Sequence, residues 1–382
     1  MMTFEQLGLA PELVKGLADE RITTPTPIQE RSIPVLLQKK DVYVCSATGT
    51  GKTLAYLLPL FQNIDIRQKS VQAMVIAPTH ELAMQIFRQA KKLAESSGMG
   101  VRTLALIGGV AVKRQIEGLK HKPHLIVGST GRILHLMDLK KINGHTITTV
   151  VVDEVDRLLG GDTTEKVRDL IARTSRSRRL VYVSATVQPV SLREVKVLAP
   201  EVIEIHVHAN QVSSTISHQY LVCEEREKGD VLRKLMHALH PHRAIAFVHR
   251  NRTAEIIADR LRYHKLPVAD IHGAHDKLSR QKGIEDLQKG RVRLLLASDV
   301  AARGLDIRDV THIFNVDIPS SSKDYLHRVG RTGRAGAQGC ALSLVTPQEV
   351  RIVQRFRKEL GIEISPVRLF RGAVEVCTSD EG

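Results

Sequence analysis

The sequence predicts an α/β protein of two domains, each a mainly parallel sheet flanked by helices, joined by a short flexible linker. Three observations support this fold. The chain has 382 residues, more than one ordinary hydrophobic core accommodates. Short apolar runs alternate with helix-length amphipathic stretches, which is typical of a parallel sheet covered on both faces. The alternation stops at a small, polar stretch, 209–216, and then restarts, so this stretch is the expected linker.

The first domain is expected to span residues 1–208 and to begin with helical segments around Thr24–Gln29. Its strands are expected at Val42–Cys45, Ala73–Ala77, Thr103–Ile107, Leu125–Val127, Val150–Val152, Leu180–Val183 and Val202–Val207. The second domain is expected at 217–366, with strands at Tyr220–Val222, Ala244–Val248, Val268–Ile271, Leu294–Ala297, His312–Asn315 and Ala341–Val345. Residues 367–382 are expected to form a short tail that is frayed at its end.

Composition and charge limit the classes of function. Hydrophobic residues make up 42% of the chain and charged residues 25%, which is typical of a soluble globular protein. The formal net charge of +15 favours a polyanionic partner, because each neutralised phosphate releases counterions. Aromatic residues are scarce at 3%, with no Trp, which argues against recognition through many base-stacking platforms. We therefore expect a nucleic acid that is bound mainly through its backbone.

The cysteines and the N-terminus indicate the compartment. The four cysteines lie far apart with no Cys-x-x-Cys pair, and the 17 histidines supply no zinc-ligand spacing. Free thiols fit a reducing compartment. The N-terminus lacks the pattern of a signal peptide, and no apolar run approaches membrane-spanning length. We expect a cytosolic or nuclear protein without membrane contact.

A glycine-containing turn, Ser46–Thr53, follows the first strand and leads into an apolar-periodic helix. Strand, turn and helix in this order are the geometry of a phosphate-binding P-loop. Gly49 and Gly51 allow a tight turn in which successive N–H groups point at phosphate oxygens. Lys52 can reach the β- and γ-phosphates, and the Thr53 hydroxyl can hold Mg²⁺. The turn begins with Ser where the usual pattern has Gly, and the alternative is a Gly-Thr-rich turn that binds nothing.

An acidic motif, Asp153–Asp156, follows the expected strand Val150–Val152. In open α/β sheets, ligand-binding residues gather where strands end. A carboxylate at a strand end opposite a P-loop suits Mg²⁺ held through water, and a neighbouring carboxylate can orient or deprotonate the attacking water. The alternative is an acidic turn that caps a helix. Ser184–Thr186 follow a further strand and supply hydroxyl groups that can hydrogen-bond a carboxylate.

Arginines alternate with glycines in the second domain, within His327–Gly336. Arg328, Arg331 and Arg334 have no acidic residue between them, and the glycines hold the chain in tight turns. This pattern favours an anion clamp over a solvated basic loop. We predict that Arg331 and Arg334 act on the γ-phosphate of a bound nucleotide from across a cleft, in the manner of an arginine finger.

Together these motifs resemble the DEAD-box ATP-dependent RNA helicases of superfamily 2, in the short bacterial form without a C-terminal extension. The resemblance runs from Phe4 to about residue 366. The ordered motifs that carry it are Thr24–Gln29, Ala47–Thr53, Pro78–Ala83, Gly108-Gly109, Ser129–Arg132, Asp153–Asp156, Ser184–Thr186, Phe247–Arg250, Ser298–Asp306 and His327–Arg334. It implies two RecA-like domains that ATP and RNA binding close and hydrolysis resets. It also implies a cytoplasmic RNA-stimulated ATPase that locally unwinds short RNA duplexes or remodels RNA–protein complexes, as in ribosome assembly.

The resemblance implies a role for each matching residue. Those expected to bind ATP and Mg²⁺ are Ile22, Gln29, Ala47, Thr48, Gly49, Thr50, Gly51, Lys52, Thr53, Asp153 and Asp306, with Thr53 and Asp153 at the metal. Glu154 would act on the hydrolytic water, and the catalytic site would be completed by His327, Arg331 and Arg334. Hydrolysis would be coupled to closure by Asp156, Ser184 and Thr186. RNA would be bound along its backbone, with little sequence specificity, by Pro78, Thr79, Glu81, Gly109, Gly131, Arg132, Arg250, Arg280, Arg303 and Gly304. A monomer is expected, with ribosomal particles among the candidate partners.

Several positions depart from the family pattern. Ile22 stands where an aromatic residue packs on adenine, His80 where an RNA-binding motif has Arg, and Lys277 where Gln precedes Arg280. The other departures are Arg21, Thr130, Val155 and Ser298. Two alternatives remain: a duplex-DNA translocase, which the motif around Gln29 argues against, and a non-catalytic RNA clamp, which the intact carboxylates oppose. The basic stretch Arg351–Arg371 fits a partner-binding surface and a solvated helix face equally well.

Overall fold

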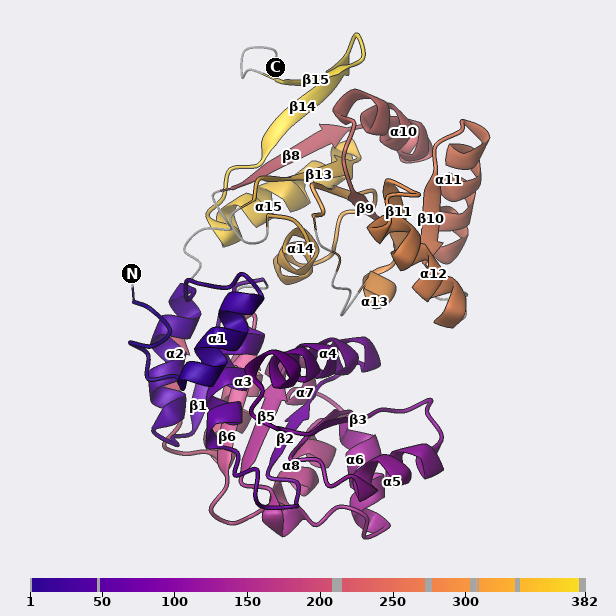
Figure 1. The fold of residues 1–382 in the computed structure, drawn as a ribbon. Coiled ribbons are helices and arrows are strands. Elements are labelled where there is room, and N and C mark those ends of the chain that lie inside the picture. The colour runs from indigo at the N-terminus through magenta and orange to yellow at the C-terminus, as the bar shows by residue number, and fades with distance from the viewer. Residues whose placement is uncertain are drawn as a thin grey trace. The chain divides into compact units, whose positions relative to one another are not determined.

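The structure of the protein, a computed structural model, describes residues 2–46, 49–207, 215–271, 277–302, 307, 309–333 and 337–377. The chain divides into two compact units, Met1–His208 and Ala209–Gly382 (Figure 1). Of the predicted linker, Thr215 and Ile216 are described, and Ile216 already begins strand β8 of the second unit.

The first unit contains a seven-stranded, fully parallel sheet with the order β3-β4-β2-β5-β6-β1-β7. Its strands are β1 (Val42–Cys45), β2 (Ala73–Ile76), β3 (Thr103–Leu106), β4 (Leu125–Gly128), β5 (Thr149–Asp153), β6 (Arg179–Ser184) and β7 (Ile203–His206). Each strand predicted for this domain is confirmed, with ends that differ by at most one residue.

Helices cover both faces of this sheet (Figure 1). They are α1 (Pro11–Asp19), α2 (Pro27–Leu37), α3 (Lys52–Asn63), α4 (His80–Ser97), α5 (Val112–Lys120), α6 (Thr130–Asp138), α7 (Val155–Leu158), α8 (Thr164–Ala172) and α9 (Pro189–Leu198). Successive strand residues alternate between two apolar cores: Val42 and Val44 pack with α1 to α4, whereas Tyr43 packs with α6 to α9. Because both faces are buried, polar side chains gather at the strand ends.

The second unit contains an eight-stranded sheet with the order β10-β11-β9-β12-β13-β8-β14-β15, parallel except for the β14–β15 pair. Its strands are β8 (Ile216–Val222), β9 (Ala244–Phe247), β10 (Val268–Ile271), β11 (Leu294–Ala297), β12 (His312–Asn315), β13 (Gly339–Val345), β14 (Ser365–Phe370) and β15 (Ala373–Val376). Its helices are α10 (Lys228–Leu239), α11 (Asn251–Tyr263), α12 (Lys277–Gln288), α13 (Asp299–Ala302), α14 (Ser322–Val329) and α15 (Val350–Leu360). The six predicted strands are confirmed, and β8 begins four residues earlier than predicted.

The prediction of a tail after residue 366 is wrong for most of that segment. β14 pairs with β8 through Ser365 and Pro366, and β15 returns antiparallel to β14. Between them, Arg371 and Gly372 have φ of 47° and 82°, and two positive φ angles are typical of a two-residue type I′ hairpin turn. Val367 is buried in the apolar core of the unit, which holds the hairpin against the sheet.

Candidate active site

The turn between β1 and α3 has the backbone shape that a P-loop requires. Gly49 and Gly51 have φ of 82° and 90°, in the left-handed region that favours glycine. A Cβ atom added to Gly51 would lie 2.6 Å from Nε2 of Gln29 and 3.2 Å from Oγ1 of Thr26, so a larger residue does not fit. Helix α3 begins at Lys52, directly after this glycine, so its first N–H groups lie at the turn. The arrangement suits an anion.

The Lys52 ammonium lies over this turn. Its Nζ donates a hydrogen bond to the carbonyl oxygen of Ser46, whose hydroxyl donates to Oγ1 of Thr50 at 3.0 Å. Burial lowers the pKa of Lys52 to about 8, and the negative charge of Asp153 opposes that shift. Burial of the ammonium therefore costs free energy, which a bound phosphate would offset.

Asp153 ends β5 and lies level with the P-loop strand. It pairs in register with Val183 of β6, and Val44 of β1 pairs with the same residue. Its Oδ2 accepts a hydrogen bond from the Tyr56 hydroxyl at 2.9 Å, and its Oδ1 accepts one from the N–H of Glu154 at 2.8 Å. Burial, together with the neighbouring charge of Glu154, raises the pKa of Asp153 to about 6. The sheet thus places a buried, oriented carboxylate two strands from β1.

Glu154 adopts a backbone conformation that is uncommon for its type. Its φ of 51° lies in the left-handed region, and this conformation turns the chain from β5 into α7. Its Oε2 lies 3.3 Å from Nη1 of Arg157, an ion pair whose side chains are 26% and 18% exposed. This conformation and the ion pair hold the carboxylate at the end of β5. Its catalytic role stays a prediction.

The three residues expected to couple hydrolysis to closure contact one another. Oγ1 of Thr186 donates a hydrogen bond to Oδ2 of Asp156 at 3.4 Å. The Ser184 hydroxyl donates to the carbonyl oxygen of Thr186 at 2.7 Å and accepts from its N–H at 3.3 Å. The loop after β6 is thereby joined to the end of the acidic motif.

Gln29 joins α2 to the P-loop. Its Nε2 donates a hydrogen bond to the carbonyl oxygen of Gly51 at 3.1 Å, and its Oε1 accepts one from the N–H of Thr26 at 2.9 Å. Both ends of the amide therefore contact backbone groups. Ile22 is half-buried and packs against the apolar core on the same face of the sheet. The adenine contacts of Gln29 and Ile22 stay predictions.

The first group of predicted RNA contacts lies in the loop between β2 and α4. Pro78 and Thr79 are half-buried there, and Oγ1 of Thr79 caps α4 by accepting a hydrogen bond from a backbone N–H at 3.2 Å. Glu81 is exposed in the first turn of α4. The imidazole of His80 packs against Gly108, in the loop after β3. A Cβ added to Gly108 would lie 2.8 Å from Cε1 and from Nε2 of His80. His80, which departs from the family pattern, thus contacts a second loop that is predicted to bind RNA.

The loops after β3 and β4 carry the remaining predicted RNA contacts of this unit. Gly109 has φ of 71°, and a Cβ added to Gly109 or Gly131 would meet no atom within 4 Å. Nη1 of Arg132 donates a hydrogen bond to the carbonyl oxygen of Val110 at 2.8 Å, so the two loops are joined. Because β2, β4 and β3 are adjacent and parallel, their following loops lie at one edge of the sheet.

In the second unit, Arg328 does not belong to an anion clamp. Its side chain is 2% exposed, and Nε and Nη2 donate to the Asp299 carboxylate at 2.6 and 2.7 Å. Its Nη1 donates to Oδ1 of Asn315 at 3.1 Å and to the carbonyl oxygen of Asp317 at 2.6 Å. The guanidinium lies 4.8 Å from the ring centroid of Phe247. The prediction of a three-arginine clamp is wrong for this residue, because its donors are used within the fold.

The other predicted residues of the second unit lie on several elements. Arg331 and His327 are half-buried at the end of α14, and Arg250 is exposed at the N-cap of α11. Arg280 is half-buried on α12. The remaining predicted site residues of both units lie outside the described residues: Ala47, Thr48, Arg303, Gly304, Asp306 and Arg334.

Two contacting residues were absent from the sequence prediction. Tyr56 follows Lys52 by four positions on α3, and Arg157 follows Glu154 by three. Residues three or four apart share one face of a helix. The spacing of Tyr56 from Lys52, and of Arg157 from Glu154, is therefore the sequence feature that could have indicated them.

Comparison with known proteins decides the family. The model for the DEAD/DEAH box helicase matches residues 26–195, and the model for the helicase conserved C-terminal domain matches residues 227–336. The DEAD-box ATP-dependent RNA helicase CshC of Bacillus cereus is 40% identical over 348 residues, 91% of this chain and 89% of that protein. The chain belongs to the DEAD-box ATP-dependent RNA helicases. The probable ATP-dependent RNA helicase YfmL of Bacillus subtilis is 40% identical over 343 residues, 89% of this chain and 90% of that protein.

Solved structures support the same fold. Dbp5 of S. cerevisiae, bound to RNA and ADP BeF3, matches with a TM-score of 0.86 at 30% identity, covering 96% of both chains. Mss116p, bound to single-stranded RNA and AMP-PNP, matches with a TM-score of 0.83 at 24% identity, which shows the fold alone. This DEAD-box helicase therefore has the two RecA-like units that the sequence predicts.

Over the described residues, no helix is both long and apolar enough to cross a bilayer. The same residues contain no group of three or more His, Cys, Asp or Glu side chains that could hold a metal ion.

Proposed function

We propose that this chain is an RNA-stimulated ATPase that unwinds short RNA duplexes or remodels RNA–protein complexes. One observation carries the proposal: a P-loop at the start of α3 and a buried carboxylate at the end of β5 lie at the same edge of one parallel sheet. That edge is where ligands bind in sheets of this kind. Membership of the DEAD-box helicases supports ATP as the nucleotide and RNA as the partner.

The residues present fit a nucleoside triphosphate with Mg²⁺. The positive φ angles of Gly49 and Gly51 keep side chains out of the phosphate cradle, and Lys52 supplies positive charge beside it. The hydroxyl of Thr53 and the carboxylate of Asp153 are the hard oxygen ligands that Mg²⁺ prefers. When bound, the cation would neutralise charge on the phosphate oxygens. The nucleoside would contact Ile22, Gln29 and Asp306.

Glu154 would hold the attacking water and accept its proton as the water oxygen bonds to the γ-phosphorus and ADP leaves. The ion pair with Arg157 supports this role, because it fixes the carboxylate relative to β5. The charge that develops on the transferred group would be stabilised by His327, Arg331 and Arg334.

The loops after β2, β3 and β4 would bind the RNA backbone through N–H groups and Arg132, joined in the second unit by Arg250, Arg280, Arg303 and Gly304. Such contacts bind phosphates and 2′-hydroxyls with little sequence specificity. The net charge of +15 supports binding to the RNA backbone.

ATP and RNA binding would close the two units, and hydrolysis would reset them through Asp156, Ser184 and Thr186. We propose a cytoplasmic monomer whose substrates include ribosomal particles during assembly.

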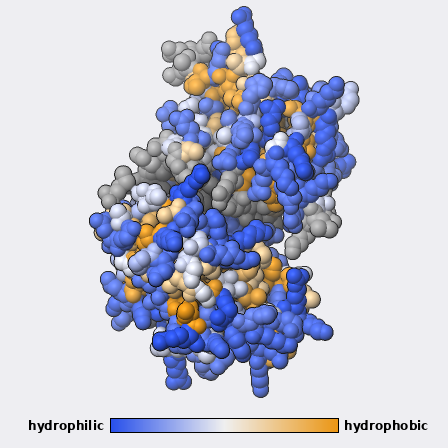
Figure 2. Space-filling view, in the orientation of Figure 1, coloured by the Kyte–Doolittle hydropathy of each residue, from blue (hydrophilic) through white to orange (hydrophobic). Residues whose placement is uncertain are grey.

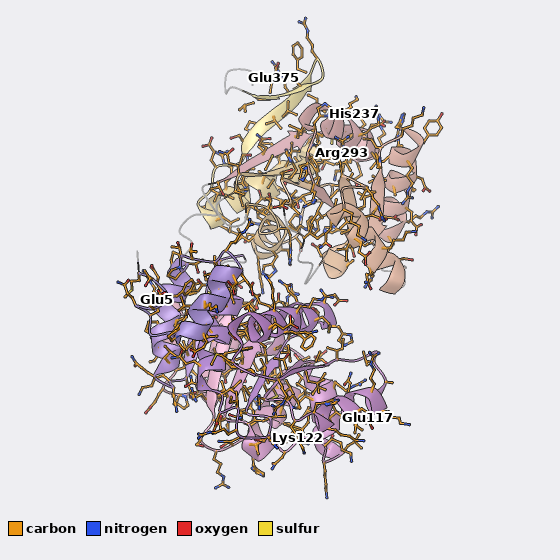
Figure 3. The ribbon with its side chains drawn as sticks, in the orientation of Figure 1. Glu5, Glu117, Lys122, His237, Arg293 and Glu375 are labelled. Carbon is orange, nitrogen blue, oxygen red and sulfur yellow. The ribbon has the colours of Figure 1, made fainter. Side chains whose placement is uncertain are left out.

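Glu154→Gln tests the proposal. The variant should lower the rate of multiple-turnover phosphate release by about 100- to 10,000-fold, because the amide cannot accept the proton. Binding of ATP and RNA should persist, since the phosphate cradle is untouched. Glu117→Gln is the matched control, because Glu117 pairs with Lys120 on an exposed surface of the same unit (Figure 3). Turnover by Glu154→Gln at the rate of the control would refute the assignment.

A further inference from the structure

The hairpin formed by β14 and β15 presents two different faces. Val367, Leu369 and Val374 pack with the apolar core that includes α10. Because strand side chains alternate, Arg368 and Phe370 of β14 lie on the opposite face, paired in register with Glu375 and Ala373 of β15. The apolar face anchors the hairpin to the core of the second unit. The face that carries Arg368 and Phe370 does not contribute to this anchoring.

Phe370 is exposed where the other phenylalanines are not. All seven phenylalanines of the chain are described, and Phe370 alone is exposed, at 44%. Burying a side chain of this size is favourable, so the exposed ring can gain contact area from a partner. The chain has no Trp and few aromatics in all, which makes this position unusual.

Two guanidinium groups lie against the Phe370 ring. Their carbon atoms are 5.3 Å (Arg368) and 5.2 Å (Arg371) from the ring centroid, within cation–π range. Arg368 also lies 3.5 Å from Glu375, an ion pair whose side chains are 52% and 43% exposed. A pair this exposed contributes little to stability, so an incoming anion can compete with Glu375 for Arg368 at small cost.

An apolar side chain lies beside this cluster. Val222 of the neighbouring strand β8 is 46% exposed on the same face, because Tyr220 pairs in register with Pro366. Val376 of β15 is 58% exposed on the opposite face, because it pairs with Val367. Figure 2 shows hydrophobic atoms over the base of the hairpin and hydrophilic atoms at its tip, and Figure 3 labels Glu375 there. The surface therefore combines a flat aromatic ring, apolar contact area and two guanidinium groups.

We propose that this surface is a second RNA-binding site, separate from the RNA-binding loops, that takes an unpaired base stacked on Phe370 and flanking phosphates on Arg368 and Arg371. Aromatic rings and guanidinium planes are the platforms on which single-stranded RNA bases stack. The chain's excess of positive charge favours RNA over a protein partner, and an acidic peptide would leave the aromatic face without a use.

The site lies apart from the loop after β9, which carries Arg250. Four strand-to-strand steps separate β14 from β9 in the sheet, which amounts to about 19 Å. A short oligonucleotide on the motif loops would not reach the hairpin. An RNA with a single-stranded extension would reach both, and the second contact would then be intramolecular. The hairpin would thus favour duplexes that carry unpaired flanks.

Phe370→Ala in the full chain tests the inference by fluorescence anisotropy at fixed salt. We use an oligoribonucleotide of roughly five nucleotides, about 17 Å long when stacked, and the same oligonucleotide with a single-stranded uridine tail. The variant should bind the tailed RNA about 5- to 100-fold more weakly, with unchanged affinity for the short RNA. RNA-stimulated ATP turnover with saturating short RNA should also be unchanged, so failure of this inference and failure of the proposed function are distinguishable.

Three further variants keep the test decisive. Phe370→Trp should retain the wild-type affinity for the tailed RNA, and Val376→Ala, an exposed apolar control on the same hairpin, should change it little. Arg371→Gln should reduce the slope of log affinity against log salt by about one. Unchanged binding of the tailed RNA by Phe370→Ala would overturn the inference, as would equal weakening for both RNAs. Loss of binding to a polyglutamate peptide instead would make the hairpin a protein-docking surface.

Discussion

Each unit contains a buried cation beside a carboxylate at a strand end, and the two pairs differ in how they are satisfied. In the first unit, Lys52 donates to the carbonyl oxygen of Ser46, and burial lowers its pKa to about 8. In the second unit, Arg328 binds Asp299 through two nitrogens and donates to further acceptors on β12 and the loop after it. The displaced pKa values of Lys52 and Asp153 make the first pair a candidate for ligand binding, whereas the donors of Arg328 are used within the fold.

The difference indicates that Lys52 of the P-loop and Arg328 of the arginine- and glycine-containing segment have separate roles. A buried charge whose hydrogen-bond capacity is filled by the protein stabilises one arrangement of the chain. A buried charge whose pKa is displaced from its ordinary value is a candidate for ligand binding, because the ligand restores the lost solvation. Substitution of one member of each pair shows whether stability or turnover depends on it.

The largest expected effect on stability is that of Arg328→Ala. The substitution leaves the Asp299 carboxylate without its main partner, which should destabilise the second unit by about 3–5 kcal/mol. Denaturant unfolding of the full chain measures the effect. The control is Arg331→Ala, at a half-buried position on the same segment, which should lower ATP turnover and change the unfolding free energy little. Equal losses of stability in the two variants would contradict the distinction.

Lys52→Met should have the opposite profile. Removal of the cation beside the phosphate cradle should lower turnover by about 100- to 1,000-fold. The melting temperature of the nucleotide-free protein should not fall, because the cost of burying the ammonium is also removed. Phosphate release and thermal unfolding of the same preparation measure both properties. A marked loss of thermal stability would make Lys52 a structural residue like Arg328.

A buried histidine supplies a third case. Burial lowers the pKa of His218 to about 4 from 6.5; its Nδ1 lies 2.8 Å from the Tyr325 hydroxyl, and its Nε2 has no hydrogen-bond partner. Burial raises the pKa of its titratable neighbour Tyr325, so this hydroxyl gains no charge below pH 7. The unfolded chain therefore binds the proton at higher pH than the folded chain, and stability falls as pH drops from about 6.5 towards 4.

The full difference corresponds to about 3 kcal/mol, and His218→Gln should remove most of it. Thermal unfolding at several pH values between 7 and 4 measures the dependence for the second unit. His237→Gln, at an exposed position on α10, should leave the dependence as in the wild type (Figure 3). An unaltered slope in His218→Gln would show that other groups control the acid response.

The smallest effect is expected for Tyr56→Phe. Loss of the hydroxyl removes a hydrogen bond to the buried Asp153 carboxylate, worth about 1.5 kcal/mol, so Mg²⁺-dependent nucleotide affinity should fall roughly tenfold. Equilibrium binding of a fluorescent ATP analogue with and without Mg²⁺ measures it. Tyr263→Phe, at an 83% exposed position, serves as the control. A Mg²⁺-dependent affinity equal to that of the control would remove Tyr56 from the site.

Much of this molecule follows from short-range sequence signals. The parallel strands were predictable because buried runs such as Leu294–Ala297 are uninterrupted and flanked by turn residues. The β14–β15 hairpin was missed although Val367, Arg368 and Leu369 alternate with period two, because Arg-Gly is a weaker turn signal than Asn-Gly or Asp-Gly. The burial of Arg328 was also unpredictable, since it depends on Asp299 and Asn315, which are distant in sequence and meet only in the folded sheet.

The central claim is that RNA stimulates ATP hydrolysis at the site of Lys52, Asp153 and Glu154. Multiple-turnover phosphate release, measured with an oligoribonucleotide and with a DNA strand of the same sequence, tests it most directly. We expect that RNA raises the rate, that DNA does not, and that Lys52→Met abolishes the response. Equal stimulation by DNA would indicate a DNA translocase, and the absence of any turnover with RNA bound would indicate a clamp; either result would contradict the account.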